Sequence, residues 1–551
     1  MRVLKWGGGT LAVLAVLGGL LWLFRFELII AAARLKNPRT GPYQAVAWAQ
    51  GPNAPPAGER PPNVVFILAD DLGFNDITLN GGGVAGGAVP TPNIDSIARQ
   101  GVTFANGYAG NATCAPSRAA IMTGRYATRF GFEFTPAPVA FSRVVGSFRS
   151  PGALHSPRFF ADRVKDAPED LGREAVPVSE ITIAQVLRQR GYHTIHLGKW
   201  HLGGSAGARP EQKGFDESLG FMAGASMYLP KADTGVENSQ QDFDPIDKFL
   251  WGALPFAVQF NGSEPFRPNA YMTDYLTDNA VAAIRANRNR PFFLYLAYNA
   301  VHTPLQAAKA DYDALPQIKD HRLRVYAAMV RNLDRNVGRV LAELKAEGLD
   351  QNTLVIFTSD NGGANYIGLP DINRPYRGWK ASFFEGGVHV PFFMRWPGRI
   401  PAGASFRSPV AHVDIFATAA GAAGAAAPRD RVMDGVDLMP FVQGQASGDP
   451  HRSLYWRSGR YKVVMAGGWK LQIAEEPKTT WLFDLNTDPT ERRDLSAARP
   501  DKVRELSALL AQLDGQMAKP LWPSLLSGPI AIDHPLGVRE KPGDAYVYWD
   551  N

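Results

Sequence analysis

Four apolar runs in this chain, the first of them continuous, each end in polar residues that can carry chemistry. The runs are residues 64–69, 192–197, 292–298 and 354–358. A short apolar run without polar alternation is typical of a strand that is buried on both faces of a sheet. The polar residues that follow the runs are, in chain order, Asp70 and Asp71; Gly198, Lys199, Trp200 and His201; His302; and Asp360 and Asn361.

Helical patterns precede two of these runs. Apolar residues recur at a spacing of three to four in residues 183–187 and again in residues 323–344, and a glycine follows each segment. Alternating helices and buried strands predict an α/β fold in which a large, mixed, mostly parallel sheet is sandwiched by helices. In such sheets ligands bind beyond the carboxyl ends of the strands, so we expect the four polar clusters to meet in one crevice.

The pattern changes after about residue 450. Short strand-like runs divided by turns predict an antiparallel sheet, followed by a helix over residues 500–517 and a last strand near 545–549. We therefore expect a smaller C-terminal α+β subdomain. The predicted division of the chain is an N-terminal membrane or signal segment (1–36), a Pro- and Gly-rich linker (37–62), a catalytic domain (63–448) and the C-terminal subdomain (449–551).

The N-terminal segment is uncharged and apolar over residues 7–24, after Arg2 and Lys5. As a helix this stretch would span roughly 27 Å, slightly less than the hydrocarbon core of a bilayer. Two hypotheses fit: a signal anchor that extends to Ala33, which we favour, or a signal peptide cleaved near residues 31–33. The basic residues that follow the segment favour a cytoplasmic domain by the positive-inside rule, which conflicts with export.

Composition narrows the class of protein. The chain has 551 residues, of which 45% are hydrophobic and 20% charged, which is typical of a globular protein and not of a disordered one. The net charge of +6 is spread along the chain instead of gathered in blocks, which argues against nucleic acid as a partner.

The single cysteine, Cys114, opens a distinctive run that continues through Pro116, Ser117 and Arg118. Pro116 favours a helix start, so Cys114 is expected beside the positive end of a helix. A thiol in that position is activated, or an anion is held there.

Oxygen ligands predict a metal site. Asp70, Asp71, Asp360 and Asn361 offer only hard oxygen donors, which suit Ca²⁺ or Mg²⁺ and argue against zinc. Adjacent carboxylates in a crevice cost free energy unless a cation or a shared proton compensates.

Two motifs resemble those of the type I, formylglycine-dependent sulfatases, which are arylsulfatase-like members of the alkaline phosphatase superfamily. The first is Cys-x-Pro-Ser-Arg at 114–118 followed by Thr-Gly-Arg at 123–125, and the second runs from Gly191 to Gly-Lys-Trp-His at 198–201. The resemblance covers roughly residues 62–520 and implies an alkaline-phosphatase-like fold. One departure is His389, where the family pattern has arginine.

The resemblance implies a role for each candidate residue. Cys114 would be oxidised to formylglycine, whose hydrate attacks sulfur, and Arg118 would steady that hydrate. Ca²⁺, favoured over Mg²⁺, would be bound by Asp70, Asp71, Asp360, Asn361 and the modified Cys114. Asp360 would help to deprotonate the attacking hydroxyl. Sulfate oxygens would be held by Lys199, His302 and Lys380. His302 or Lys199 would protonate the leaving alcohol, and His201 would take the proton whose loss expels sulfate.

The expected function is therefore hydrolysis of a sulfate monoester. The alternatives are a phosphonate monoester hydrolase or phosphodiesterase of the same superfamily, and a non-enzymatic, membrane-tethered binding protein. Expected partners are a sulfated glycan or a small sulfate ester, a formylglycine-generating maturation enzyme, and the membrane. The resemblance implies export, to the periplasmic face of the membrane or, after cleavage, to the periplasm or medium. Residues 133–180 lack family motifs and are expected to face the substrate.

Overall fold

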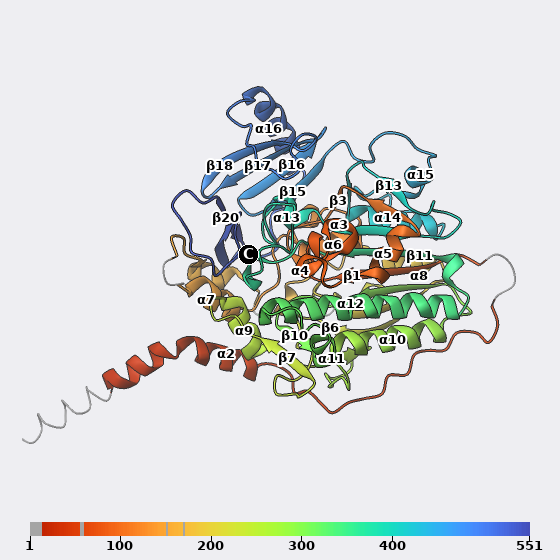
Figure 1. The fold of residues 1–551 in the computed structure, drawn as a ribbon, viewed down its shortest axis with the longest axis horizontal. Coiled ribbons are helices and arrows are strands. Elements are labelled where there is room, and N and C mark those ends of the chain that lie inside the picture. Colours follow the sequence, from red (N-terminus) through yellow and green to blue (C-terminus); the bar gives the residue numbers. More distant parts are fainter. Residues whose placement is uncertain (1–13, 56–59, 150–152, 169–170, 206) are drawn as a thin grey trace, which may run out of the picture.

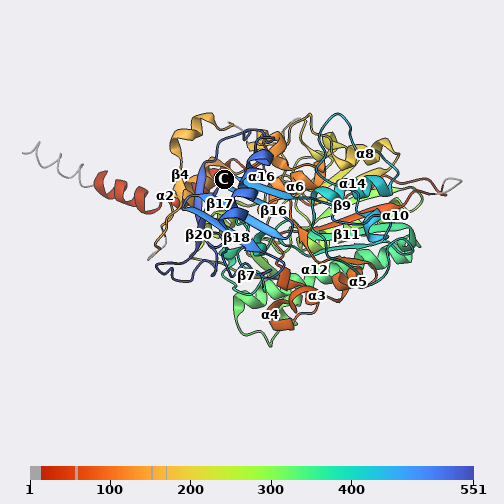
Figure 2. The ribbon, with the colours of Figure 1, turned by 90° about the horizontal axis from the view of Figure 1, so that it is seen from above.

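The computed structural model describes residues 14–55, 60–149, 153–168, 171–205 and 207–551. Its centre is a nine-stranded sheet with helices on both faces (Figures 1 and 2). The strands lie in the order β13 (Ala404–Phe406), β2 (Val102–Phe104), β12 (Phe392–Arg395), β11 (Thr353–Ser359), β1 (Asn63–Ala69), β9 (Phe292–Ala297), β5 (His193–Lys199), β6 (Glu217–Phe221) and β8 (Gln259–Phe260).

The four predicted strands are neighbours at the middle of this sheet, in the order β11, β1, β9, β5. All three pairings between them are parallel, with Val65 opposite both Val355 and Leu294, and Ile195 also opposite Leu294. Their carboxyl ends therefore share one edge, where all four polar clusters begin. The predicted α/β class is confirmed.

Alternate residues of the central strand β1 face different cores. Val65 and Ile67 pack into one hydrophobic cluster, and Phe66 and Leu68 into another. The first core includes buried residues of α5 (Pro92–Arg99), α10 (Met272–Ala286) and α12 (His321–Ala346). The second includes those of α6 (Cys114–Thr123), α8 (Ile183–Gln189) and α14 (Val413–Ala422). Burial on both faces explains why residues 64–69 of β1 are continuously apolar.

The C-terminal part has the predicted antiparallel sheet, β15 (Leu454–Ser458), β16 (Tyr461–Ala466), β17 (Trp469–Glu475) and β18 (Lys478–Asp484), with α16 (Pro500–Asp514) packed on it. A further sheet pairs β20 (Tyr546–Asp550) with β19 (Leu526–Ala531), and β19 with β4 (Arg158–Phe159). The pairing with β4 was not expected, because β4 precedes β19 by more than half the chain. The domain boundary at 448 stays a prediction.

Shorter elements complete the described chain. They are α3 (Thr78–Gly81), α4 (Val84–Gly87), α7 (Val139–Ser147), α9 (Pro245–Ala253), α11 (Lys309–Asp313), α13 (Glu385–Val388), α15 (Met439–Val442), and the strand pairs β7 (Val236–Ser239) with β10 (Leu305–Ala308) and β3 (Gly107–Tyr108) with β14 (Val410–Ala411).

The N-terminal helices project from one end of the molecule (Figure 1). Leu14–Leu23 and α2 (Arg25–Leu35) meet at a bend of 69°. Among the described residues no single helix is long and apolar enough to cross a membrane, although this bent pair together meets the requirement. The first part of the predicted apolar segment, residues 7–13, lies outside the described residues.

The predicted linker is extended, and it contacts residues of the predicted catalytic domain. Trp48 is buried and its indole Nε1 donates to Asn279 Oδ1 at 3.3 Å. The Ala49 backbone N–H donates to Glu217 Oε1 at 2.9 Å. The described part of residues 37–62 is thus packed along the domain instead of hanging free.

Gly198 lies near the end of β5, directly before Lys199. We predict that Gly198→Ala strongly destabilises the protein. Its φ is +102°, and a Cβ there would lie 1.9 Å from the Ala297 carbonyl oxygen of β9, which is fixed in the sheet. We expect a loss of at least about 3 kcal/mol in the free energy of unfolding, measured by urea denaturation. The control Gly348→Ala also has a positive φ, of +69°, but an open surrounding, so it should cost only about 1 kcal/mol. Equal losses in the two variants would contradict the prediction.

Candidate active site

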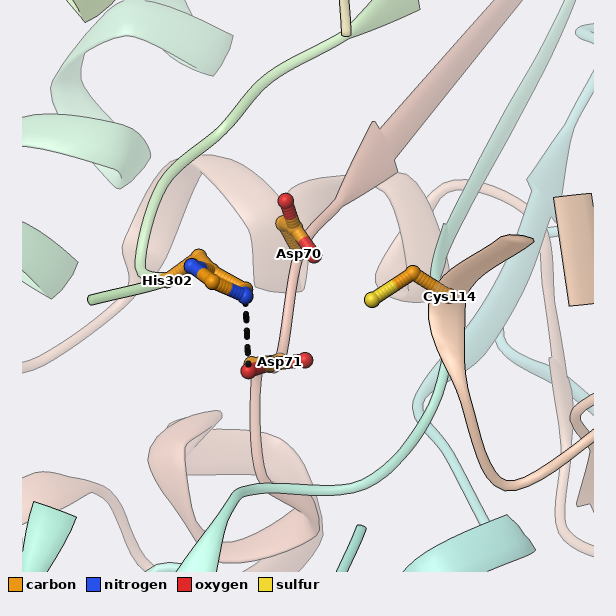
Figure 3. A group of neighbouring side chains, drawn as sticks. All are labelled: Asp70, Asp71, Cys114 and His302. Carbon is orange, nitrogen blue, oxygen red and sulfur yellow. Dashed lines mark ion pairs between the residues drawn. The ribbon is translucent and has the colours of Figure 1, made fainter. Parts of the chain in front are cut away.

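The side chains of Asp70, Asp71, Cys114 and His302 point toward a common space (Figure 3). Each offers one ligand atom, and these atoms all lie within 4.8 Å of one another. The aspartates follow β1 and His302 follows β9, as the strand pattern predicts. Cys114 is the first residue of α6, and the helix starts two residues earlier than Pro116 indicated. All four side chains are buried.

Two lysines neutralise the paired aspartates. Lys199 Nζ, at the end of β5, donates to Asp70 Oδ2 at 2.6 Å. Lys380 Nζ donates to Asp71 Oδ1 at 2.7 Å and to Cys114 Sγ at 3.2 Å. The predicted nucleophile position is therefore in direct contact with a buried cation.

Arg118 lies one turn into α6 and joins Asp360 to the same cluster. Its Nε donates to Asp360 Oδ2 at 2.9 Å, and its Nη1 donates to the Lys199 carbonyl oxygen at 3.1 Å. Next to Asp360, Asn361 Nδ2 donates to Asp71 Oδ1 at 2.8 Å. Segments that are hundreds of residues apart in the chain thus meet at one point.

Burial and neighbouring charges shift the pKa values of the buried site residues in different directions. Burial, reinforced by the Asp360 carboxylate, raises the pKa of Asp70 to about 7. Burial also opposes ionisation of Asp71, but Lys380 and His302 outweigh it and hold the pKa of Asp71 well below its usual range. For Cys114, Lys199 and Lys380 overcome the effect of burial and lower the pKa of the thiol to about 6. The cluster favours negative charge at position 114.

The pKa values of the two candidate histidines are shifted in opposite directions. Burial, together with the charge of Lys199, holds the pKa of His201 far below its usual value, so its ring is neutral. Neither ring nitrogen of His201 has a hydrogen-bond partner among the described residues. His302 Nδ1 donates to the Thr303 carbonyl oxygen at 2.5 Å, and its Nε2 lies 3.6 Å from Asp71 Oδ2. Burial lowers the pKa of His302, but the Asp71 charge outweighs this and raises it overall.

The oxygen atoms of the cluster fit a hard divalent cation. Asp70 Oδ1 and Asn361 Oδ1 are buried and have no hydrogen-bond partner within the described parts of the chain. Buried oxygens without partners are costly, and coordination of a cation would satisfy them. His302 belongs to the group that surrounds this space, whereas the Asp360 carboxylate faces Arg118 and the backbone N–H of Asp71.

Tyr366 belongs to the cluster and was missed by sequence reasoning. Its hydroxyl donates to Asp71 Oδ2 at 3.0 Å. No motif marks it, because a tyrosine in a loop after Asn361 carries no periodic signal. His389, the departure from the family pattern, lies outside the cluster: its ring contacts Glu385 Oε2 at 2.8 Å and stacks on Tyr376.

A cavity of about 1520 Å³ opens from the cluster. Cys114, His201, His302 and Lys380 line its inner end. Its walls continue over residues 135–148, part of the segment that was expected to face the substrate.

The comparisons with known proteins define the class. The sulfatase family model matches residues 62–425, and the model described as N-sulphoglucosamine sulphohydrolase, C-terminal, matches residues 378–519. The chain belongs to the sulfatase family, and it is a hydrolase of sulfate esters. Members of this family generally use a formylglycine and a divalent metal.

Individual relatives cover most of the chain. N-acetylgalactosamine-6-sulfatase of Mus musculus is 33% identical over 78% of this chain and 75% of its own length. Steryl-sulfatase of Mus musculus is 31% identical over 82% of this chain and 81% of its own length. Among solved structures, Ps i-CgsB in complex with k-i-k-neocarrahexaose is 30% identical with a TM-score of 0.69, covering 84% of this chain and 95% of that one.

Proposed function

We propose that this sulfatase cleaves its ester with a formylglycine made from Cys114, assisted by Ca²⁺ bound to Asp70, Asp71, Asp360, Asn361 and the modified residue 114. The observation that carries the proposal is the position of Cys114 Sγ, 3.2 Å from Lys380 Nζ and grouped with both aspartates. The hydrated aldehyde supplies an oxygen nucleophile with a second hydroxyl, so that the sulfate bound to it leaves by elimination. A divalent cation neutralises negative charge on the nucleophile and the ester.

Cationic side chains would hold the ester. Lys199, Lys380 and His302 surround the space next to Cys114, where they offset the charge that spreads over the sulfate oxygens. Both lysines contact the carboxylates that would bind the cation. When those carboxylates bind a cation, a sulfate oxygen becomes the natural partner of each ammonium group.

The contacts and charges of the site residues suggest which of them donate and accept protons during the reaction. Asp360, fixed by Arg118, would assist loss of the proton from the attacking hydroxyl. His302 or Lys199 carries a proton to the alcohol oxygen as the S–O bond breaks. Neutral His201, whose ring nitrogens have no partner in the described parts of the chain, then takes the proton from the second hydroxyl as sulfate is released. Water restores the hydrate, so the balance is ester plus water to alcohol plus sulfate.

We further propose that the protein is exported and anchored to the outer, periplasmic face of the membrane by its N-terminal helices. The bent apolar pair supports an anchor. A formylglycine-generating enzyme is the implied maturation partner. The substrate is a sulfated sugar or a small sulfate ester, and relatives named for both kinds support this range.

The experiment that tests the reaction class compares 4-nitrophenyl sulfate with 4-nitrophenyl phenylphosphonate on the purified full-length protein. We expect kcat/KM to be at least about 100-fold higher for the sulfate, because it presents three oxygens to Lys199, Lys380 and His302, whereas the phosphonate has a phenyl group in place of one of them. Higher kcat/KM for the phosphonate would replace the proposal with the phosphonate hydrolase alternative.

A further inference from the structure

The cavity that begins at Cys114 ends against the N-terminal helix α2. Ile29, Ala32 and Ala33 of α2 line it, in the same continuous space that Cys114 and Lys380 line at the other end. Figure 1 shows α2 beside α7 and α9, at the end of the molecule where the N-terminal helices project. A segment that resembles a signal or anchor is therefore also a wall of the substrate cavity.

The walls of the cavity near α2 are mainly apolar, although Lys36 and Arg143 also line it. Phe141 and Val145 of α7 and Phe249 and Leu250 of α9 line it close to α2. With Ile30, Val144 and Ala253, Phe249 and Leu250 form a hydrophobic cluster of their own, separate from the cores on the two faces of the sheet. A volume of about 1520 Å³ exceeds the roughly 300–1,000 Å³ of common small-molecule sites, so it admits much more than a sulfate group.

Three of the four acidic residues that line the cavity have hydrogen-bond partners, and the fourth, Asp242, is exposed. Glu174 Oε2 accepts from the Ala137 backbone N–H at 3.0 Å. Asp244 caps α9 by accepting from the backbone N–H groups of Ile246 and Asp247. Glu540 likewise accepts from backbone N–H groups. Sugar hydroxyls need free donors and acceptors, and part of the acceptor capacity of these three carboxylates is already used by the backbone.

Apolar and polar contacts hold α2, and the chain just beyond it, against α9. Ile30 is buried, and Glu27 Oε1 pairs with Lys248 Nζ of α9 at 2.7 Å. Just beyond the helix, Asn37 Nδ2 donates to the Ala253 carbonyl oxygen at 2.6 Å. Cleavage near residues 31–33 would remove Ile29 and Ile30 and open this wall.

From these contacts we infer that α2 is retained in the mature enzyme as a wall of the active-site cavity, and that the cavity binds a sulfate ester of a large apolar alcohol. The inference rests on the proposed function, because the ester must reach residue 114. The sulfate lies at the cationic end, and the apolar alcohol extends toward α2.

The first test measures kcat/KM for 4-methylphenyl, 4-butylphenyl and 4-octylphenyl sulfate on the full-length protein, with a sulfated disaccharide in parallel. The three phenols have similar acidity, so the series changes apolar contact and not leaving-group chemistry. Full burial gives up to about fourfold per methylene, and we expect at least a tenfold rise from methyl to octyl. A flat series with faster turnover of the sugar would overturn the inference but leave the proposed function standing. No turnover of any ester would refute the proposed function itself.

The second test fills the cavity at α2. Ala33→Trp should lower the ratio of kcat/KM for the octyl over the methyl ester by at least about tenfold, because the indole occupies the space of the chain. Ala31→Trp is the matched control: Ala31 is an exposed residue of the same helix that does not line the cavity, so the ratio should not change. Equal ratios in both variants would show that the alcohol does not reach α2.

A crosslink tests whether α2 stays docked, without reference to activity. A Cβ on Gly252 would lie 3.6 Å from Ile30 Cβ, within the range of disulfides. In purified Ile30→Cys/Gly252→Cys protein, mild oxidation should join the N-terminal peptide to the α9 peptide, as seen by mass spectrometry before and after reduction. Ala31→Cys/Gly252→Cys should remain uncrosslinked. Absence of residues 25–35 from the mature protein, or equal crosslinking of both pairs, would overturn the inference.

Discussion

Cys114→Ala should leave a folded protein whose kcat for 4-nitrophenyl sulfate is at least about a thousandfold lower than that of the wild type. The substitution removes the precursor of the nucleophile, so only binding and electrostatic contributions to catalysis remain. The folded state should tolerate the change, because one buried sulfur atom is lost from the first residue of α6, at a cost of about 1 kcal/mol.

A matched control separates chemistry from packing. Ile121→Val also removes one buried heavy atom from α6, but outside the cluster, and should keep most of the wild-type kcat. In the wild type, the tryptic peptide of residues 100–118 should have the mass of an aldehyde in place of the thiol of Cys114. Wild-type turnover by Cys114→Ala would refute the assignment of the nucleophile.

Asp71→Asn should abolish calcium binding and lower kcat/KM by at least about a hundredfold. The amide has the size of the carboxylate but lacks its charge, and it leaves Lys380 without its anionic partner. In the wild type, calcium at 100 times its Kd should stabilise the fold by about 2.7 kcal/mol and raise Tm, and a chelator should reverse both this shift and the activity. In Asp71→Asn the Tm should not respond to calcium.

Asp371→Asn is the control for this measurement, because Asp371 is an exposed aspartate paired with Arg374 on the surface. Its Tm should respond to calcium as the wild type does. An unchanged calcium response in Asp71→Asn would mean that the ion binds elsewhere. A response to magnesium alone would correct the identity of the metal.

The central sheet could be predicted from sequence because its signals are local. Each of the strands β1, β5, β9 and β11 contains an apolar run followed by polar residues, and parallel pairing brings those residues to one edge. Most of the metal and catalytic candidates could likewise be placed together, since the aspartates and Asn361 directly follow strands, Lys199 ends one and Cys114 opens a helix. Lys380 lies in a loop, and only the family resemblance indicated it.

Other features depend on contacts that no local pattern encodes. Tyr366 reaches Asp71 from a single short 3-10 turn, and β4 pairs with a strand that is synthesised much later. The packing of α2 against α9 involves ordinary apolar residues such as Ile30, which an anchor or signal segment would contain in any case. Which surface an apolar helix covers is decided by the assembled fold.

The last strand, β20, has a consequence for how the enzyme is made. Trp549 lines the cavity and packs against Phe383, with ring centroids 5.2 Å apart, and Phe383 follows Lys380 by three residues. On the ribosome, the loop that carries this lysine therefore lacks its contact with Trp549 until translation has passed that residue. Nascent chains halted before that point should accumulate as inactive, protease-sensitive species, even though every proposed catalytic residue has already been incorporated.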